Sequence, residues 1–131
     1  MRTQYTVALS MLAGVAVGAV SVGGLYAQGK APGAYAIIAF SDVGDPAAFK
    51  ANVLDKAPEV IKKHGGHFVV RTNDIIALRA GDPPLKRYVI IGFDGVQQAK
   101  AWYGADDMKD INAYNEKHTK GSAFVVEAAL Q

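Results

Sequence analysis

Apolar residues along this chain fall into short continuous runs, and segments with helical spacing separate these runs. The runs are rich in Val, Ile, Ala and Phe and are bounded by Gly, Asp and Pro, a pattern that is typical of β-strands. They predict strands over residues 34–41, 67–80, 86–94 and 122–130. The second of these contains Thr-Asn-Asp at residues 72–74, which predicts a bulge or a turn in its middle.

Helical spacing follows the first predicted strand. Asp45 is expected to cap this helix, with Pro46 at the first helical position. Pro58 lies inside the apolar pattern and has no backbone N–H, so a kink or a restart is expected there. The glycine pair at residues 65–66 is expected to end the helix, and His64 before it acts as a favourable cation at the helix C-terminus.

A second helix, in two parts, is predicted between the third and the fourth strand. Asp94 is expected to cap the first part and Gly104 to break it. Asp106 and Asp107 open the second part, which is expected to end near residues 117–121. The positions expected to face inward are Val96, Ala99, Trp102, Tyr103, Met108, Ile111 and Tyr114.

The resulting order is strand, helix, strand, strand, two-part helix, strand. This βαββαβ order predicts an α+β, ferredoxin-like fold, in which an antiparallel sheet carries the helices on one face. The apolar runs are continuous, whereas a sheet with one solvated face shows alternation. A second copy of the chain is therefore expected to cover the open sheet face, forming a homodimer. The alternative is a monomer whose open face binds an apolar ligand.

The start of the chain differs from the rest. Arg2 is followed by no charged residue until Lys30, and residues 6–27 are mostly Val, Ala, Leu and Gly. This pattern predicts a cleaved secretory signal peptide. The stretch is also long enough to span a bilayer, so an uncleaved membrane anchor is the alternative. Either way the domain is expected to be exported, to the periplasm or the extracellular space. The predicted signal peptide, linker and domain cover residues 1–27, 28–33 and 34–131.

Charge and cysteine content narrow the function classes. The chain has 14 Lys and Arg, 12 Asp and Glu, and no cysteine. Nucleic acid is not expected as a partner, because its binding needs a basic face and the two charge signs alternate along this chain. The lack of cysteine excludes a disulfide framework and thiolate metal ligands. A metal site is not expected, because His64 and His67 have no third ligand at a recognisable spacing.

Four short segments of the chain resemble one protein family. They are Gly-Gly-His-Phe-Val-Val-Arg at residues 65–71, the strand at 87–93, Ala-x-x-Trp-Tyr at 99–103 and the closing strand at 122–127. Their order and spacing over residues 34–129 are similar to the domain-of-unknown-function family 1330, in its exported subset. The resemblance implies a ferredoxin-like domain that dimerises sheet to sheet into an α/β barrel, and it implies no function.

Relatives by this fold have diverse activities. They include monooxygenases that act on aromatic polyketides, haem-binding peroxidases, haem-degrading enzymes and lactone isomerases. A shared fold does not by itself establish a shared function. This chain also departs from the family at His67, where Arg or Lys is usual, so a role that needs a permanent cation at this position is in doubt.

Four residues are candidates for a ligand site between the helices and the sheet. Arg71, on a strand with both faces covered, could hold a carboxylate of a small ligand, and the alternative is a structural ion pair with Glu127. Trp102 and Tyr103 could form the aromatic wall of a pocket, or simply pack in the core. His118 is expected on the inward side of its helix, as a general base or an axial haem ligand; alternatively it is a satisfied interior histidine or a helix-terminal cation.

Three functional hypotheses follow. The first is an exported homodimer that binds a small, partly apolar ligand in the pocket between helices and sheet. The second is a cofactor-independent enzyme of the monooxygenase or isomerase type that uses the same pocket. Such enzymes carry no short motif, and this chain has neither a Gly-x-Ser-x-Gly nor a Ser-x-x-Lys motif. The third is a haem protein that uses His118. No cofactor is expected under the first two.

Overall fold

The computed structural model describes residues 31–79 and 81–129, so the predicted signal peptide or anchor lies outside the described part. No helix among these described residues is long and apolar enough to cross a membrane. Along the chain the elements are β1 (Ala34–Asp42), α3 (Pro46–Phe49), the π-helix η1 (Lys50–Leu54), α4 (Ala57–Lys63), β2 (His67–Thr72), β3 (Arg87–Phe93), α5 (Val96–Tyr103), the 3-10 helix η2 (Asp106–Met108), α6 (Lys109–His118) and β4 (Lys120–Glu127).

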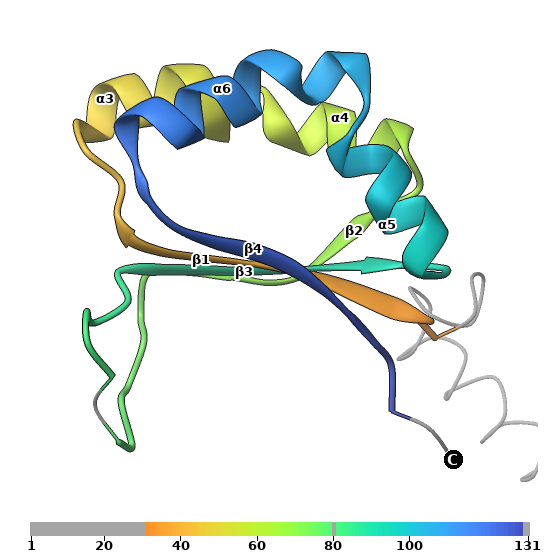
Figure 1. Cartoon of the computed structure of the whole chain (residues 1–131), viewed down its shortest axis with the longest axis horizontal. Helices are drawn as coiled ribbons and strands as arrows, with labels where there is room; N and C mark the ends of the chain where they lie inside the picture. The colour runs from red at the N-terminus through yellow and green to blue at the C-terminus, as the bar shows by residue number, and fades with distance from the viewer. Residues whose placement is uncertain (1–30, 80, 130–131) are drawn as a thin grey trace, which may run out of the picture. The chain divides into compact units, whose positions relative to one another are not determined.

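The strands form one antiparallel sheet in the order β2-β3-β1-β4. All helices of the described domain lie on one face of this sheet, as Figure 1 shows. The helical connections cross over that face and place β1 between β3 and β4. This arrangement confirms the predicted α+β, ferredoxin-like fold.

The first helical region is divided next to Pro58, as predicted. Asp45 caps α3, and its Oδ1 accepts a hydrogen bond from the backbone N–H of Ala47 at 3.3 Å. The chain then widens into η1, which ends at Leu54, and it restarts as α4 at Ala57. In a continuous helix, Pro58 could not donate to the carbonyl of Leu54 and its ring would clash with it, so the break falls between them.

The two glycines after α4 serve different structural needs. Gly65 has a φ of 83°, in the left-handed region, and its N–H donates to the carbonyl of Lys62 at 3.1 Å. The N–H of Gly66 donates to the carbonyl of Ile61 at 2.9 Å, which completes a Schellman motif. A Cβ on Gly66 would lie 2.8 Å from the ring of Phe93, so this close approach to the core requires glycine.

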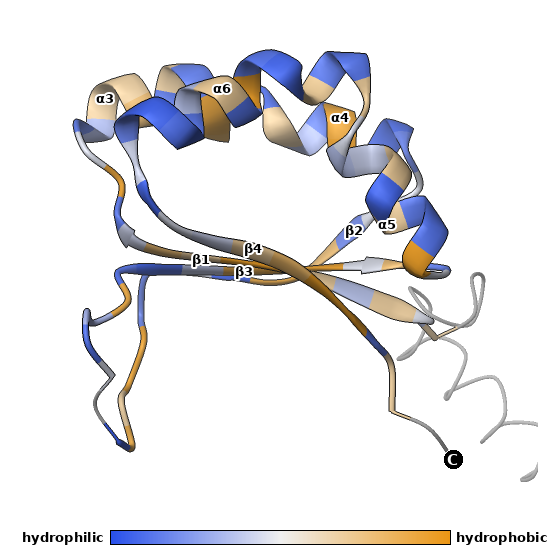
Figure 2. Cartoon of the chain, viewed as in Figure 1, coloured by the Kyte–Doolittle hydropathy of each residue, from blue (hydrophilic) through white to orange (hydrophobic). Residues whose placement is uncertain are grey.

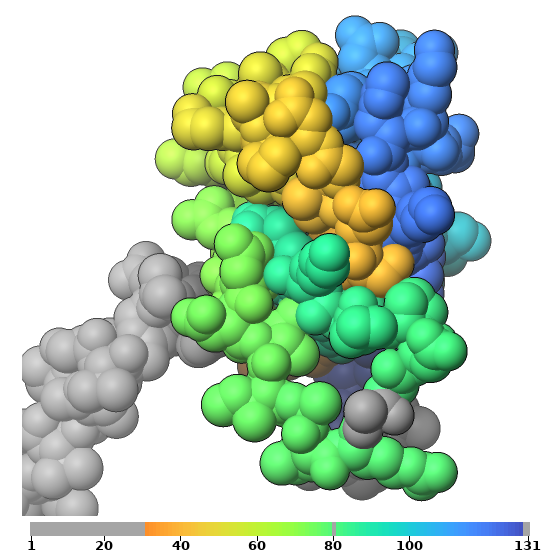
Figure 3. Space-filling model, turned by 90° about the vertical axis from the view of Figure 1, so that its left-hand side faces the viewer, coloured from red at the N-terminus to blue at the C-terminus, as the bar shows by residue number. Residues whose placement is uncertain are grey.

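The second predicted strand is shorter than expected. β2 ends at Thr72, and residues 73–79 and 81–86 belong to a connection without strand structure, here called the arm. The hydroxyl of Thr72 accepts a hydrogen bond from the backbone N–H of Asp74 at 2.8 Å, and this turn directs the chain off the sheet. The prediction of a strand through residue 80 is therefore wrong. The arm extends on the side of the sheet away from the helices (Figures 1 and 3).

The other boundaries differ from the predictions by a few residues. Gly95 caps α5 in place of Asp94, and no side chain forms a capping hydrogen bond there. Gly104 ends α5, as predicted. β4 begins at Lys120, two residues earlier than expected, because this residue pairs with Asp42 at the end of β1.

The core lies between the sheet and the helices. Its largest fully buried side chains are those of Trp102, Phe93, Ile91 and Met108. The rings of Phe93 and Trp102 lie 5.4 Å apart, and those of Phe40 and Phe49 meet edge to face at 5.2 Å. These contacts tie α3 and α5 to the sheet. The apolar strands from which the sheet-side residues come are visible in Figure 2.

The opposite face of the sheet has no covering element in the described chain, and we call it the open face. Phe124 and Val126 of β4 are 48% and 38% exposed there. In the arm, Ile76 and Leu78 are 87% and 99% exposed. By strand alternation and register, the open face carries no Asp, Glu, Lys or Arg between the strand ends; its residues are Tyr35, Ile37, Ala39, His67, Val70, Thr72, Tyr88, Ile90, Ser122, Phe124 and Val126.

Candidate ligand-binding cavity

A cavity of about 720 Å³ lies between the sheet and the helices. Its floor is the helix-covered face of the sheet, and its walls come from α3, η1, the start of α4, α5, η2 and α6. Ligand pockets for small molecules are typically about 300–1,000 Å³ and mostly apolar. The cavity therefore has the size and position of a small-molecule site.

One end of the cavity is apolar, because Trp102 of α5 packs there on Phe93 at the end of β3. The other buried apolar side chains that line the cavity from the helices are Phe49, Val53, Met108 and Ile111. All these side chains belong to the buried core. The same apolar packing that holds the helices on the sheet therefore also forms the cavity wall.

The other end is polar, and strand register explains its position. Arg87 of β3, Phe40 of β1 and Gly121 of β4 lie in one row across the sheet, because β1 pairs with both neighbours at Phe40. Asn115 and Glu116 of α6 line the cavity, together with Thr119 and Lys120 at the start of β4. The cavity is thus amphipathic, with its polar groups near the end of the sheet from which the arm leaves.

A β-bulge turns Arg71 toward this cavity. The register between β2 and β3 shifts between Phe68 and Val70, earlier than the predicted position at residues 72–74. Without the extra residue, Arg71 and Phe68 would point to opposite faces; with it they share a face, and the guanidinium carbon lies 4.3 Å from the Phe68 ring centroid. The alternative ion pair with Glu127 is wrong, because β2 and β4 lie at opposite edges of the sheet.

Arg87 is a second cation of the cavity that the sequence reasoning missed. It lies two residues before Val89, which pairs with Arg71, so both arginines project to the helix-covered face. Its Nη1 donates a hydrogen bond to Oδ1 of Asn73 at 3.0 Å. Burial, and then the charge of Arg71, lower the pKa of Arg87 below its ordinary value. The strand alternation in the sequence could have identified Arg87 as an inward residue. Every second residue from Arg87 onward, at Val89, Ile91 and Phe93, is buried in this strand.

Polar atoms with no partner concentrate at this cavity. Arg87 Nε, Trp102 Nε1 and Asn115 Oδ1 are buried without a hydrogen-bond partner among the described residues, and all three residues line the cavity. A buried polar group without a partner costs about 1–3 kcal/mol of stability. A ligand that bonds to these atoms would recover that free energy.

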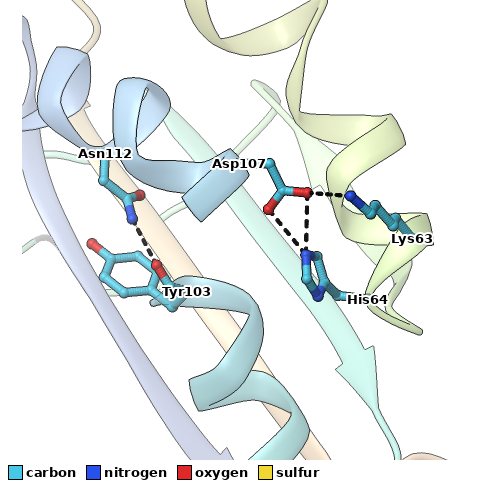
Figure 4. Close-up of polar contacts among 5 residues, drawn as sticks. All are labelled: Lys63, His64, Tyr103, Asp107 and Asn112. Carbon is cyan, nitrogen blue, oxygen red and sulfur yellow. Dashed lines mark hydrogen bonds and ion pairs between the residues drawn. The ribbon is translucent and has the colours of Figure 1, made fainter. Parts of the chain in front are cut away.

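The aromatic candidates Trp102 and Tyr103 both line the cavity but differ in exposure. Trp102 is 1% exposed, whereas Tyr103 is 41% exposed, and their rings meet at 5.7 Å. They also line a smaller cavity of about 280 Å³ against β1 and β4. Asn112 Nδ2 donates to the carbonyl oxygen of Tyr103 at 2.8 Å, which joins α6 to the end of α5 (Figure 4).

His118 does not line either cavity. It is exposed at the end of α6, and its ring stacks on Tyr114 at 4.6 Å. The expected inward orientation is not found, because the last turn of α6 abuts the loop after β1, where a Cβ on Gly44 would lie 2.6 Å from the His118 carbonyl oxygen. An axial haem ligand or general base must face its substrate, so His118 has neither position here.

His64 belongs to a separate charged cluster. Its Nε2 lies 3.0 Å from Oδ1 of Asp107, and Lys63 Nζ lies 3.2 Å from Oδ2 of the same carboxylate (Figure 4). The hydrogen bond from His64, followed by that from Lys63, holds the pKa of Asp107 below its ordinary value. This cluster ties the end of α4 to η2. Among the described residues, no group of three His, Cys, Asp or Glu side chains could hold a metal ion.

The order and the pairing of the elements define a class of protein, the domains with a ferredoxin-like α+β fold. The chain belongs to the family described as domain of unknown function (DUF1330), whose sequence model matches residues 33–129. Among the curated proteins, nothing matches the chain.

Two solved structures share the fold at low sequence identity. The cofactor-independent oxygenase SnoaB from Streptomyces nogalater is 16% identical, with a TM-score of 0.54 over 77% of this chain and 97% of that one. A protein of unknown function from Rhodopseudomonas palustris is 11% identical, with a TM-score of 0.58 over 85% of this chain and 94% of that one. At these identities the similarity shows the fold alone.

Proposed function

We propose that this protein is an exported homodimer that binds a small, partly apolar molecule in the cavity between the helices and the sheet. The observation that carries the proposal is the cavity of about 720 Å³ with three buried, unpartnered polar atoms on its lining residues. The cavity is partly open to solvent, and its volume lies within the range of small-molecule sites. Its amphipathic lining suits a partly apolar ligand.

The homodimer is supported by the open face. Its exposed residues Phe124 and Val126, and Ile76 and Leu78 of the arm on the same side of the sheet, would remain in water in a monomer. Large exposed apolar patches on soluble domains mark interaction sites. A second copy supplies a surface of the same chemistry, and isologous pairing is the commonest way to bury it.

Export is supported by the uncharged, apolar stretch at residues 6–27. Cleavage after Ala27 would release the domain into the periplasm or the extracellular space. Retention of the stretch would leave the domain anchored to the membrane on the same side. Mass spectrometry of the protein recovered from its native compartment distinguishes these forms, because cleavage yields a chain that begins at Gln28.

The ligand-binding proposal can be tested with the chain's single tryptophan, Trp102. Nile red, a neutral apolar dye, is expected to become fluorescent on binding and to quench Trp102 by energy transfer. Ala57→Phe fills the cavity at its wall and is expected to weaken dye binding at least about tenfold. Ala113→Phe is the matched control, because Ala113 is exposed on α6 and does not line the cavity. Dye binding that is equal in both variants would contradict the proposed site.

The second candidate function is a cofactor-independent oxygenase or isomerase that uses the same cavity. It is favoured by the fold shared with SnoaB and by the indole N–H of Trp102, a free donor at the cavity wall that could bind a substrate oxygen. Proteins with the same fold often have unrelated functions, so the enzymatic function ranks second to ligand binding. Oxygen uptake with an electron-rich aromatic phenol separates an oxygenase from a binding protein, because only the oxygenase consumes O2. An enzyme shows turnover that Trp102→Phe reduces more than it reduces binding, whereas a binding protein shows no turnover.

A further inference from the structure

The two arginines of the cavity lie on one face without a carboxylate partner. Arg71 and Arg87 form no ion pair in the part of the chain that the structure describes; the ion pairs there involve Lys50, Lys63, His64 and Lys109. The charged residues that line the cavity are Arg71, Arg87 and Lys120 against a single carboxylate, Glu116. The polar end of the cavity therefore has an excess of positive charge.

This arrangement is unfavourable for the empty protein. The half-buried guanidinium of Arg87 is repelled by that of the exposed Arg71, and the lowered pKa of Arg87 reflects its burial first and then this charge. Arg87 also has a buried Nε without a partner. An anion placed between the two groups would remove the repulsion and supply an acceptor.

The shape of the site limits the kind of anion. Guanidinium groups bind planar carboxylates through paired N–H donors, so two neighbouring arginines favour a carboxylate head group. The register places these arginines at the polar end, whereas Trp102 packs on Phe93 at the opposite end of β3. A ligand that satisfies both ends has a carboxylate head and an apolar body.

We infer that the cavity binds a monocarboxylate with an apolar body, with its carboxylate against Arg71 and Arg87 and its body toward Trp102. This inference rests on the proposed ligand-binding function and names the ligand class. It assigns to Arg87 a direct role in binding. The β-bulge in β2 contributes to this site, because it turns Arg71 to the same face of the sheet as Arg87.

The test compares a carboxylate with its own amide. Decanoate and decanamide, and 2-naphthylacetate and its amide, are used to displace Nile red at neutral pH. Each acid is expected to bind about tenfold or more tightly than its amide, the range of a hydrogen bond to a charged group. Arg71→Met and Arg87→Met are expected to abolish this ratio by weakening the acid alone. Arg79→Met, at an exposed arm position that does not line the cavity, is expected to keep it.

The outcomes separate this inference from the proposed function. Dye binding with no preference for either acid overturns the carboxylate inference and leaves the cavity as a binding site for neutral molecules. Failure of the dye and of all four compounds to bind overturns both.

A second measurement needs no variant and so remains informative if a variant fails to fold. It follows the carboxyl resonance of 13C-labelled decanoate through a pH titration. Two adjacent cations favour the ionised form, so the bound acid is expected to have a pKa below that of free decanoate. An equal or higher pKa in the bound acid overturns the inference.

Discussion

The two faces of the sheet differ in their charged residues and in whether they bound a cavity. The helix-covered face bounds a cavity and carries Arg71 and Arg87, two cations without anionic partners. The open face has no Lys, Arg, Asp or Glu between the strand ends, and it exposes Phe124 and Val126. One face bounds an amphipathic cavity within the domain, and the other is an uncharged, largely apolar surface.

This difference suggests a division of roles. A flat apolar surface without charge suits another protein surface, because it is buried without leaving an unpaired polar group. A cavity with unpaired cations and unpartnered polar atoms suits a small molecule that can satisfy them. We therefore propose that the open face binds the partner copy and that the helix-covered face binds the ligand.

The largest expected effect is on assembly. Phe124→Asp places a charge in the apolar surface, and burying that charge unpaired in an interface costs several kcal/mol, so the dimer is expected to dissociate about a thousandfold more readily. Sedimentation or native mass spectrometry measures this. Gln97→Asp, on the exposed side of α5, is the control and is expected to leave the dimer intact. A Phe124→Asp protein that stays dimeric would remove the open face from the interface.

The next effect is on stability at the cavity wall. Trp102 is fully buried against Phe93, so Trp102→Ala is expected to lower the free energy of unfolding by about 3–5 kcal/mol. Its neighbour Tyr103 is 41% exposed, and Tyr103→Ala is expected to cost about 1 kcal/mol. Urea unfolding followed by circular dichroism measures both. If both variants lost the same free energy of unfolding, the buried Trp102 and the exposed Tyr103 would contribute equally to stability, which would contradict this prediction.

A smaller effect distinguishes a binding cation from a structural one. Arg87→Met removes a half-buried charge beside Arg71 and the unpartnered Nε, and it leaves a side chain of similar length. The unliganded protein is expected to keep its stability or to gain up to about 1 kcal/mol. A loss of about 2 kcal/mol or more in thermal or urea unfolding would identify Arg87 as a structural residue.

The smallest effect concerns the charges that are paired. Because its pKa is lowered in the folded protein, Asp107 stabilises the fold above the ordinary carboxyl pKa, and this contribution is lost as the pH falls through the folded-state pKa. Asp107→Asn is therefore expected to lower the melting temperature near neutral pH, and the difference from wild type should shrink in acid. Because the cluster is near the surface, added salt should reduce the difference too. A difference in melting temperature between wild type and Asp107→Asn that grows as the pH falls would contradict this prediction.

The sequence was sufficient for the fold because its main determinants are local. Asp45, Pro58 and Gly65 act through caps, the missing N–H of proline and a positive φ, and each had its expected effect. The family resemblance agrees with these local signals over residues 33–129. The uncovered sheet face also followed from the continuous apolar runs, which a single layer of helices cannot bury on both sides.

The site was less predictable because it depends on register. The direction of Arg71 follows from a bulge between Phe68 and Val70, and no residue type marks that bulge. Arg87 is close to Arg71 only because of the pairing of β2 with β3. His118 has the helical phase of an inward residue, but its ring packs on Tyr114 and does not line the cavity, although Asn115 and Thr119 on either side of it do. Such placements are set by tertiary contacts between distant segments.

The most direct test of this division of roles is chemical-shift mapping of the 15N-labelled domain during titration with decanoate. The single indole N–H, from Trp102, gives an isolated cross-peak beside the backbone signals. The account predicts that this peak and the amides of Arg71 and Arg87 shift in a saturable way, while those of Phe124 and Val126 do not. Shifts confined to Phe124 and Val126 would contradict it, because they would place the ligand on the open face.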